Sequence, residues 1–234
     1  IRDLVRSRGL GDVYKRQTQT TFHSNLPMSE GYDIFTQWQN SIITHEEHYL
    51  SRFVESPLAH PTVMFRKKLI KKYGLYHTGN VPEDYELWLR WLDKGVKFYK
   101  IPEPLLQWND HESRLSRTHD NYSKEAFYTI KCEYLAAWMK HSLPAEKKVV
   151  ICGSSKIVRK RADLLRELGI DVFGYTDVKQ VRNRNIHFIP LHQLIDPENR
   201  FIVNFISKRG VRESVRTHFM HLGFVEGKDF ILAA

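Results

Sequence analysis

The pattern of apolar and polar positions along the chain divides it into two regions. Residues 18–142 are rich in aromatic side chains and mix strand and helix patterns, whereas residues 148–234 alternate short β-branched runs with helical patterns. Residues 143–147 lie between them and contain Pro144, which interrupts the preceding helical pattern. We therefore expect two domains joined by a linker at 143–147.

In the first region, the clearest prediction is a helix that begins at 82–84 and ends at Gly95. Its apolar side chains recur at the spacing of one helix face, and glycine is common directly after a helix C-terminus. The acids at its start suit the positive end of the helix dipole. The other elements predicted here are a strand at 62–65, a helix at 66–73, strands at 96–101 and 105–108, and a helix at 122–140.

In the second region, predicted strands and helices alternate. Such alternation makes a parallel sheet with helices on its faces. The predicted fold class is therefore α/β, with a small, parallel-sheet, Rossmann-like domain at 148–234. The predicted elements are strands at 148–152, 171–175, 186–189, 201–206 and 230–232, a helix ended by Gly169, a helical turn at 191–195, and a helix with apolar residues from Val211 to Leu222.

Residues 1–17 have neither an amphipathic period nor capping residues. They resemble translated adapter sequence, and we exclude them from the fold as one excludes an expression scar. The expectation that follows is that the natural sequence before Thr18 is missing.

Composition and charge narrow the classes of partner. The chain is 41% hydrophobic and carries a net charge of +9, which favours anionic partners such as nucleic acid, anionic lipid or a phosphorylated substrate. No pattern of an RNA-binding module or a helix-turn-helix is present, so no specific nucleic-acid partner is expected. Binding of nucleic acid through charge alone stays open as an alternative, as does peripheral contact with a membrane surface.

The sequence also bears on localisation. No apolar run reaches the length of about 18 residues that a membrane span needs. The two cysteines, Cys132 and Cys152, have no metal-type spacing and are typical of buried thiols in a reduced compartment. We expect a cytoplasmic protein, with contact at the inner face of the membrane left open.

Glu83 and Asp84 are the strongest candidates for chemistry. Two acids open a helix after a loop that contains Pro82, so at least one carboxylate can point into a cleft. A carboxylate placed there can accept the proton of an attacking hydroxyl, which is general base catalysis. The alternative is that both acids only complement the helix dipole.

A family resemblance rests on four blocks in register. They are His60-Pro-Thr-Val-Met-Phe-Arg66, Glu83-Asp-Tyr-Glu-Leu-Trp-Leu-Arg90, Ile101-Pro-Glu-Pro-Leu-Leu-Gln-Trp108 and His111-Glu-Ser-Arg-Leu-Ser116. Over roughly residues 50–120, the chain resembles the bacterial family 2 glycosyltransferases, GT-A-fold enzymes that use nucleotide-sugar donors. The resemblance implies that residues 18–142 are the acceptor-side half of such a domain, with a partial mixed sheet and helices. It also implies that Asp84 is the catalytic base and Glu83 its neighbour.

The resemblance extends to the metal and the substrates. An inverting transfer needs a base for the acceptor hydroxyl and a metal or cationic group for the diphosphate leaving group. His111 is implied as a ligand of Mn²⁺ or Mg²⁺, although imidazole suits Mn²⁺ better and a surface histidine is the alternative. Arg114 and Arg117 could bind phosphate oxygens. For His60, packing under the helix that begins with Glu83 and Asp84 is the favoured alternative to substrate binding. The implied substrate-binding side chains are His60, Trp108, Arg114 and Arg117.

One departure from the family bears on activity. The chain contains no Asp-x-Asp motif, the pair of carboxylates that holds the donor-binding metal in that family. We therefore expect this chain to be inactive alone. The native enzyme is expected to transfer a sugar from a nucleotide-sugar donor to a glycan or lipid-linked acceptor in cell-envelope polysaccharide synthesis.

The second region carries a partial nucleotide-binding pattern. Gly153-Ser-Ser155-Lys-Ile-Val158 follows a predicted strand where dinucleotide-binding domains have Gly-x-Gly-x-x-Gly, and Asp177 stands where an acid would hold a ribose. Only the first glycine is present, which weakens the case for NAD(P) at Gly153, Ser155 and Asp177. We favour a module used for packing or assembly, similar to the small Rossmann-like modules of some bacterial sugar transferases. The alternative for the whole chain is a non-catalytic nucleotide- or NAD(P)-binding scaffold.

Overall fold

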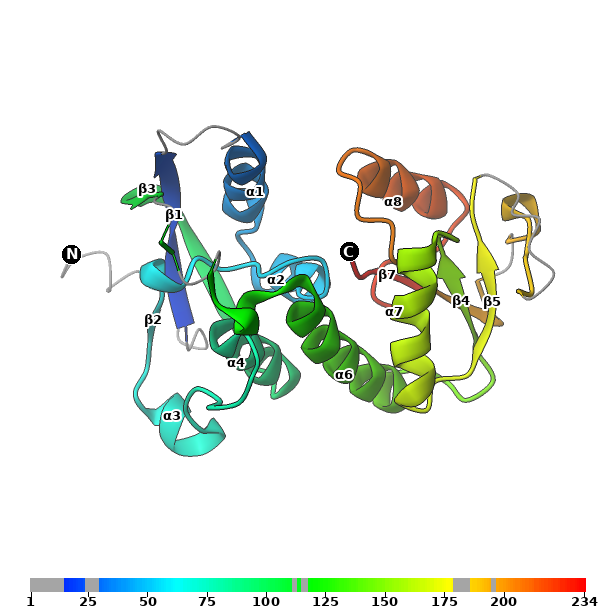
Figure 1. The fold of residues 1–234 in the computed structure, drawn as a ribbon, viewed down its shortest axis with the longest axis horizontal. Coiled ribbons are helices and arrows are strands. Elements are labelled where there is room, and N and C mark those ends of the chain that lie inside the picture. The colour runs from blue at the N-terminus through cyan, green and yellow to red at the C-terminus, as the bar shows by residue number, and fades with distance from the viewer. Residues whose placement is uncertain (1–14, 24–29, 111–112, 115–117, 179–185, 195–196) are drawn as a thin grey trace. The chain divides into compact units, whose positions relative to one another are not determined.

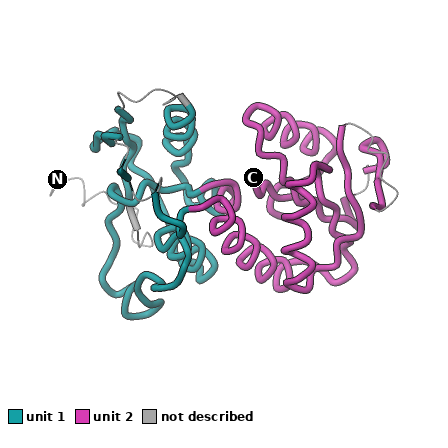
Figure 2. Tube along the Cα trace, viewed as in Figure 1, with its two compact units in different colours: residues 1–49, 56–122 teal, residues 50–55, 123–234 magenta. Residues whose placement is uncertain are grey.

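The computed structural model describes residues 15–23, 30–110, 113–114, 118–178, 186–194 and 197–234. The chain forms two compact units, which Figure 2 distinguishes by colour. Unit 1 comprises residues 1–49 and 56–122, and unit 2 comprises residues 50–55 and 123–234. The division therefore lies before the long helix that follows Tyr122, not at the expected linker 143–147.

That long helix, α6 (Lys124–Ser142), belongs to unit 2 because it packs against α7 (Lys156–Glu167). Its N-terminus is capped by the Ser123 hydroxyl, which accepts a hydrogen bond from the Ala126 backbone N–H. The sequence pattern predicted this helix correctly. It could not predict the unit to which the helix belongs, because that depends on which element packs against its apolar face.

Unit 1 contains a three-stranded mixed sheet with the order β2-β1-β3 (Figure 1). The central strand pairs antiparallel with β2 and parallel with β3. The elements of unit 1 are β1 (Lys15–His23), α1 (Glu30–Ser41), the 3₁₀ helix η2 (His60–Thr62), β2 (Met64–Phe65), α3 (Lys68–Tyr73), α4 (Glu83–Asp93), β3 (Phe98–Asn109) and η3 (Asp120–Tyr122), while α2 (His45–Ser51) continues into unit 2.

The sequence pattern did not predict the helices α1 and α2, nor the strand β1. It is rich in threonine and glutamine and has no apolar alternation. Its residue Thr20 is held from the side by Asn40 of α1, whose amide group accepts from the Thr20 N–H and donates to the Thr20 carbonyl at 2.9 and 2.7 Å. Residues 15–17, which the sequence analysis excluded from the fold, form the start of this strand.

The strand β3 also differs from its prediction. Two strands were expected at 96–101 and 105–108, but a single strand runs through Pro102 and Pro104. Register shifts between Thr18 and Thr20 of β1 accommodate the prolines, which cannot donate ladder hydrogen bonds.

The core of unit 1 is built around α4. Its residues Leu87, Trp88, Trp91 and Leu92 are fully buried and pack with Phe98 of β3, as part of one cluster. The predicted apolar face of this helix is thus confirmed as the buried one. Burial of both tryptophans fixes the helix and with it the position of the acids at its N-terminus.

Unit 2 contains a four-stranded parallel sheet with the order β5-β4-β6-β7 (Figure 1). This arrangement confirms the predicted α/β class with a mixed sheet followed by a Rossmann-like parallel sheet. The prediction of a separate strand at 186–189 was wrong, because Phe188 forms only an isolated bridge with Tyr175. The elements, besides α6 and α7, are β4 (Lys148–Cys152), β5 (Val172–Thr176), the 3₁₀ helix η4 (Leu191–Gln193), β6 (Arg200–Asn204), α8 (Val211–His221) and β7 (Phe230–Leu232).

In the part of the chain that the structure describes, no helix combines the length and apolar character needed to cross a bilayer.

Among the described residues, one lysine in each unit is buried among backbone carbonyls. Lys131 is 3% exposed, and its ammonium nitrogen donates to the Val54 carbonyl at 2.8 Å. In unit 1, Lys100 donates to the Gln39 carbonyl and is 1% exposed. Burial lowers the pKa of both lysines from 10.5 to about 7, because the charged form loses its hydration.

Because the pKa of both lysines is lowered in the folded chain, we expect the free energy of unfolding to rise with pH between about 7 and 8.5. Above pH 7 the folded chain releases protons that the unfolded lysines still hold, which adds about 1.4 kcal/mol per pH unit for each lysine at most. Above about pH 9 the slope falls toward zero, because burial raises the pKa of Cys132 and Cys152 to about 12 and the protons that these thiols release on unfolding offset those that the lysines take up. Urea titrations at pH 7.0 and 8.5 measure the slope. Lys131→Met should reduce it, and an equal slope in this variant would contradict the assignment.

Candidate functional site

The N-terminus of α4 presents two partly exposed carboxylates. Pro82 occupies the N-cap position in an extended conformation, and Glu83 and Asp84 form the first turn with Glu86. Negative charge is favourable at this end of a helix. The Asp84 carboxylate accepts a hydrogen bond from the Tyr85 backbone N–H at 2.7 Å. Both acids therefore have fixed positions at the edge of unit 1.

Glu83 is held by Tyr122, which lies 39 residues away in η3. The Tyr122 hydroxyl donates to the two carboxylate oxygens of Glu83, with oxygen–oxygen distances of 2.7 and 2.6 Å. Burial, the hydrogen bond to Glu83 and the charges of Glu83 and Asp84 raise the pKa of Tyr122 well above its usual value. The phenol thus stays protonated at neutral pH and acts as a donor.

A second tyrosine brings His60 to the same place. The His60 Nε2 lies 2.8 Å from the Tyr76 hydroxyl, and the His60 ring meets the edge of Trp88 with centroids 5.8 Å apart. The pKa of Tyr76 is raised by burial and then by the negative charges of Asp84 and Glu83. The structure thus groups His60, Tyr76, Glu83, Asp84 and Tyr122 into what we call the carboxylate site.

The segment that carries Tyr76 is clamped to α4 by a buried ion pair. Arg90 donates to both oxygens of Glu86 at 2.9 Å, and its remaining N–H groups donate to the backbone carbonyls of Tyr73 and Leu75. Glu86 is only 4% exposed. In the Glu-Asp-Tyr-Glu-Leu-Trp-Leu-Arg block, the second glutamate and the arginine therefore position the site and do not face substrate.

Replacing Arg90 with methionine is expected to lower the free energy of unfolding by about 3 kcal/mol, because it leaves the buried Glu86 carboxylate without its partner. Chemical denaturation followed by tryptophan fluorescence measures the change. Lys94→Met, at an exposed pair near the end of the same helix, is the control and should change stability by less than about 0.5 kcal/mol. Equal effects of the two variants would contradict the clamp.

Two other candidates, Trp108 and Arg114, form a different group at the carboxyl end of β3. The Arg114 guanidinium lies 4.4 Å from the centroid of the Trp108 ring, and it forms a 2.7 Å ion pair with Asp110. It also lies 5.2 Å from the ring of Tyr32. Arg114 is thus engaged by neighbouring side chains, and a role in phosphate binding stays a prediction.

The predicted metal ligand His111 and the predicted substrate ligand Arg117 lie outside the described residues. Among the residues that are described, no three His, Cys, Asp or Glu side chains gather closely enough to hold a metal ion. Asp110, the carboxylate beside His111, is the ion-pair partner of Arg114. A metal at His111 therefore stays an expectation.

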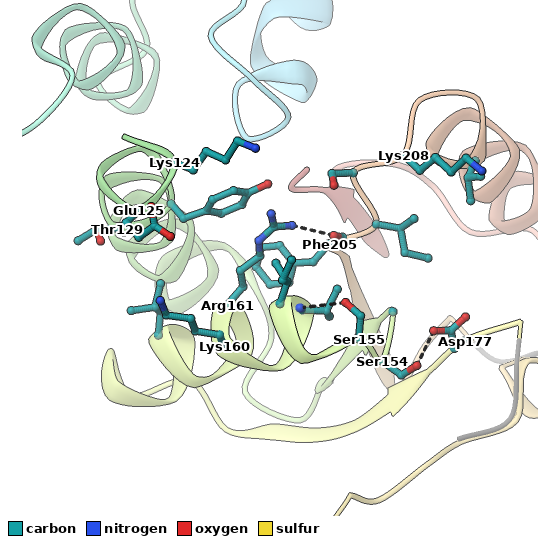
Figure 3. A pocket seen from close by; sticks show the side chains of 18 of the residues that line it. Lys124, Glu125, Thr129, Ser154, Ser155, Lys160, Arg161, Asp177, Phe205 and Lys208 are labelled. Atoms are coloured by element: carbon teal, nitrogen blue, oxygen red, sulfur yellow. Dashed lines mark hydrogen bonds between the residues drawn. The ribbon is translucent and has the colours of Figure 1, made fainter. Parts of the chain in front are cut away.

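Unit 2 contains a cavity of about 1050 Å³, shown in Figure 3, which we call the unit 2 cavity. The structure brings Gly153, Ser155 and Asp177 together on its wall, as the sequence pattern required. Ser155 is the N-cap of α7, its hydroxyl accepting from the Val158 N–H at 3.3 Å. The Ser154 hydroxyl donates to the Asp177 carboxylate at 2.6 Å.

Sequence reasoning missed the side chains that complete these sites. Tyr76 and Tyr122 surround the acids of the carboxylate site, and Tyr128 and Arg161 stack at 3.6 Å on the wall of the unit 2 cavity. None of them belongs to a motif with a chemical meaning in one sequence. Only the packing of distant segments reveals them.

Comparison with known proteins supports a relationship for part of the chain. A stretch of 75 residues is 35% identical to the O-antigen biosynthesis glycosyltransferase WbnJ of Escherichia coli, covering 31% of this chain and 30% of that protein. Part of this chain is therefore related to a glycosyltransferase. The match spans about a third of the relative's length, and neither a protein-family model nor a solved structure matches the chain.

Proposed function

We propose that this chain supplies the acceptor-side part of an inverting, family 2-like glycosyltransferase of the GT-A fold. The observation that carries the proposal is the carboxylate site, where the partly exposed Asp84 stands at the start of α4 beside a glutamate fixed by Tyr122. The similarity of 75 residues to a glycosyltransferase supports it. The enzyme would transfer a sugar from a nucleotide-sugar donor to a glycan or lipid-linked acceptor in cell-envelope polysaccharide synthesis.

In this proposal Asp84 accepts the proton of the acceptor hydroxyl as that oxygen attacks the anomeric carbon. The Tyr122 hydroxyl donates to the Glu83 carboxylate, which holds Glu83 as a fixed neighbour of Asp84. His60 and Tyr76 offer further donors or acceptors at the same place for sugar hydroxyls. The residues of the carboxylate site thus bind and orient the acceptor and remove its proton.

The departing diphosphate needs a positive partner, and a divalent metal, Mn²⁺ or Mg²⁺, supplies that chemistry in the proposal. His111 is the residue that would hold it, and Arg114 and Arg117 would meet phosphate oxygens. The net charge of +9 is consistent with anionic substrates and with work at the cytoplasmic face of a membrane.

The function is tested with the protein encoded by the complete reading frame at the native locus. Membranes that contain lipid-linked glycans are incubated with that protein, a divalent metal and radiolabelled nucleotide sugars in turn. We expect one donor to label the lipid fraction, and NMR of the product to show an inverted anomeric configuration. Retention of configuration would contradict the inverting mechanism, and the absence of transfer from every donor would contradict the proposed activity.

A further inference from the structure

The unit 2 cavity lies at the place where open parallel sheets bind ligands. In the strand order β5-β4-β6-β7, the chain leaves β4 toward one side for β5 and then crosses to the other side for β6. Ligands bind at such a reversal, in the crevice outside the carboxyl ends of the strands. The residues that follow β4, β5 and β6 all line the cavity, namely Gly153–Ser155, Asp177–Val178 and Phe205–Lys208.

Two polar side chains, Thr176 and Asn204, are buried in the last row of the sheet beneath these loops, beside Cys152 and Leu232. Thr176, Cys152 and Asn204 are paired in register across β5, β4 and β6. The side-chain atoms Thr176 Oγ1 and Asn204 Nδ2 have no hydrogen-bond partner within the described chain. Buried polar atoms without a partner are uncommon in folded proteins, and a bound ligand is one explanation for them. This edge of the sheet is therefore not built as an ordinary apolar core.

The walls of the cavity combine apolar surface with positive charge. Apolar side chains come from α7 and from the segment after β6, including Ile157, Leu164 and Ile206. Lys124 and Lys208 lie on opposite sides of the cavity, with Arg161 between them (Figure 3). A flat apolar group with phosphates attached would satisfy both kinds of surface.

Asp177 adds an acceptor for hydroxyl groups. It follows the second strand of the unit, and the Ser154 hydrogen bond fixes its carboxylate at the cavity wall. An acid at this position of a Rossmann-like sheet accepts hydrogen bonds from ribose hydroxyls. The cavity thus has a place for a ribose at Asp177 and places for phosphate at the cations.

The loop after β4 decides between a mononucleotide and a dinucleotide. Gly153 has a φ of +108°, and a Cβ there would lie 3.1 Å from the side chains of Val158 and Ile206. In a dinucleotide-binding loop, a glycine at the position of Val158 lets the helix pack closely against the strand. Here the Val158 side chain fills that space. Ser155 stands where backbone alone meets a bridging pyrophosphate, and its hydroxyl caps α7.

We propose that the unit 2 cavity binds a ribonucleoside diphosphate, with its ribose on Asp177 and its phosphates toward Arg161 and Lys208. The cavity is lined by residues of unit 2, and the inference does not depend on the proposed transferase activity. A dinucleotide such as NAD⁺ should bind more weakly, because the loop after β4 does not admit its pyrophosphate.

Isothermal titration of the full chain with ADP, UDP, 2′-deoxy-ADP, NAD⁺ and inorganic phosphate tests this site. We expect ADP or UDP to bind with micromolar affinity, 2′-deoxy-ADP to bind about tenfold more weakly than ADP, and phosphate alone not to compete at millimolar concentration. Asp177→Asn should weaken ADP about tenfold and remove the preference for ribose over deoxyribose. Asp171→Asn, an exposed acid before the same strand, is the matched control and should bind ADP as the parent chain does.

Two further variants keep the outcomes distinct. Lys208→Ser, at an exposed side chain, should weaken ADP but leave adenosine unchanged, which tests the phosphate end even if Asp177→Asn does not fold. Asp84→Asn should leave ADP affinity unchanged, because that residue belongs to unit 1. No binding of either diphosphate, unchanged affinity in both Asp177→Asn and Lys208→Ser, or NAD⁺ binding tenfold tighter than ADP would overturn the proposal.

Discussion

Replacement of Asp84 with asparagine is expected to lower the rate of sugar transfer about a thousandfold, within the range of about 10² to 10⁴ that general base catalysis contributes. Asparagine preserves the shape of the side chain and can still accept from the Tyr85 N–H, but its amide cannot take a proton from the acceptor hydroxyl. Substrate affinity should change little, since only the transition state uses the base. Initial rates of the full-length enzyme over a range of acceptor concentrations separate the two quantities.

The carboxylate site offers matched controls for this experiment. Asp93→Asn removes an exposed acid from the other end of α4 and should leave the rate unchanged. Glu83→Gln should lower the rate less than Asp84→Asn, because Glu83 acts as a neighbour fixed by Tyr122. A larger loss of rate in Glu83→Gln than in Asp84→Asn would assign the base to Glu83. An unchanged rate in Asp84→Asn would mean that the acids only complement the helix dipole.

Replacement of Trp91 with alanine is expected to lower the free energy of unfolding by about 4 kcal/mol. The Trp91 side chain is fully buried in the core of unit 1, where its ring packs against Phe65 and Trp88 with centroids 5.0 and 5.9 Å apart. Truncation leaves a large cavity that the neighbouring rings cannot fill, because they are held by their own contacts. Urea denaturation followed by circular dichroism measures the loss.

Met64 provides the control for the core prediction. It precedes Phe65 in β2 and is 62% exposed, so Met64→Ala should change stability by less than about 0.5 kcal/mol. If Trp91→Ala were as mild as Met64→Ala, α4 could not be the element that fixes the acids of the carboxylate site.

Most elements of unit 2 could be predicted to within about two residues, and the strand expected at 186–189 is the exception. Its strands are short β-branched runs, and its helices end at glycines such as Gly169, which has a φ of +79°. These signals are local, so one sequence contains them. In unit 1 the pattern failed for β1, because a strand of threonine and glutamine owes its stability to β3 and to Asn40, neither of which is a local signal.

The sequence by itself offered candidate residues for chemistry, and it placed Glu83 and Asp84 at the start of a helix, since helix period and capping act over a few residues. It also determined the alternation that makes unit 2 a parallel sheet. Only the tertiary structure decided what surrounds those residues: Tyr122 on Glu83, His60 beside Tyr76, and Arg161 and Asp177 on the wall of one cavity. Such contacts join residues 16 and 39 positions apart in the sequence, and they form because burying aromatic surface brings the segments together, a cooperative effect that no local pattern encodes.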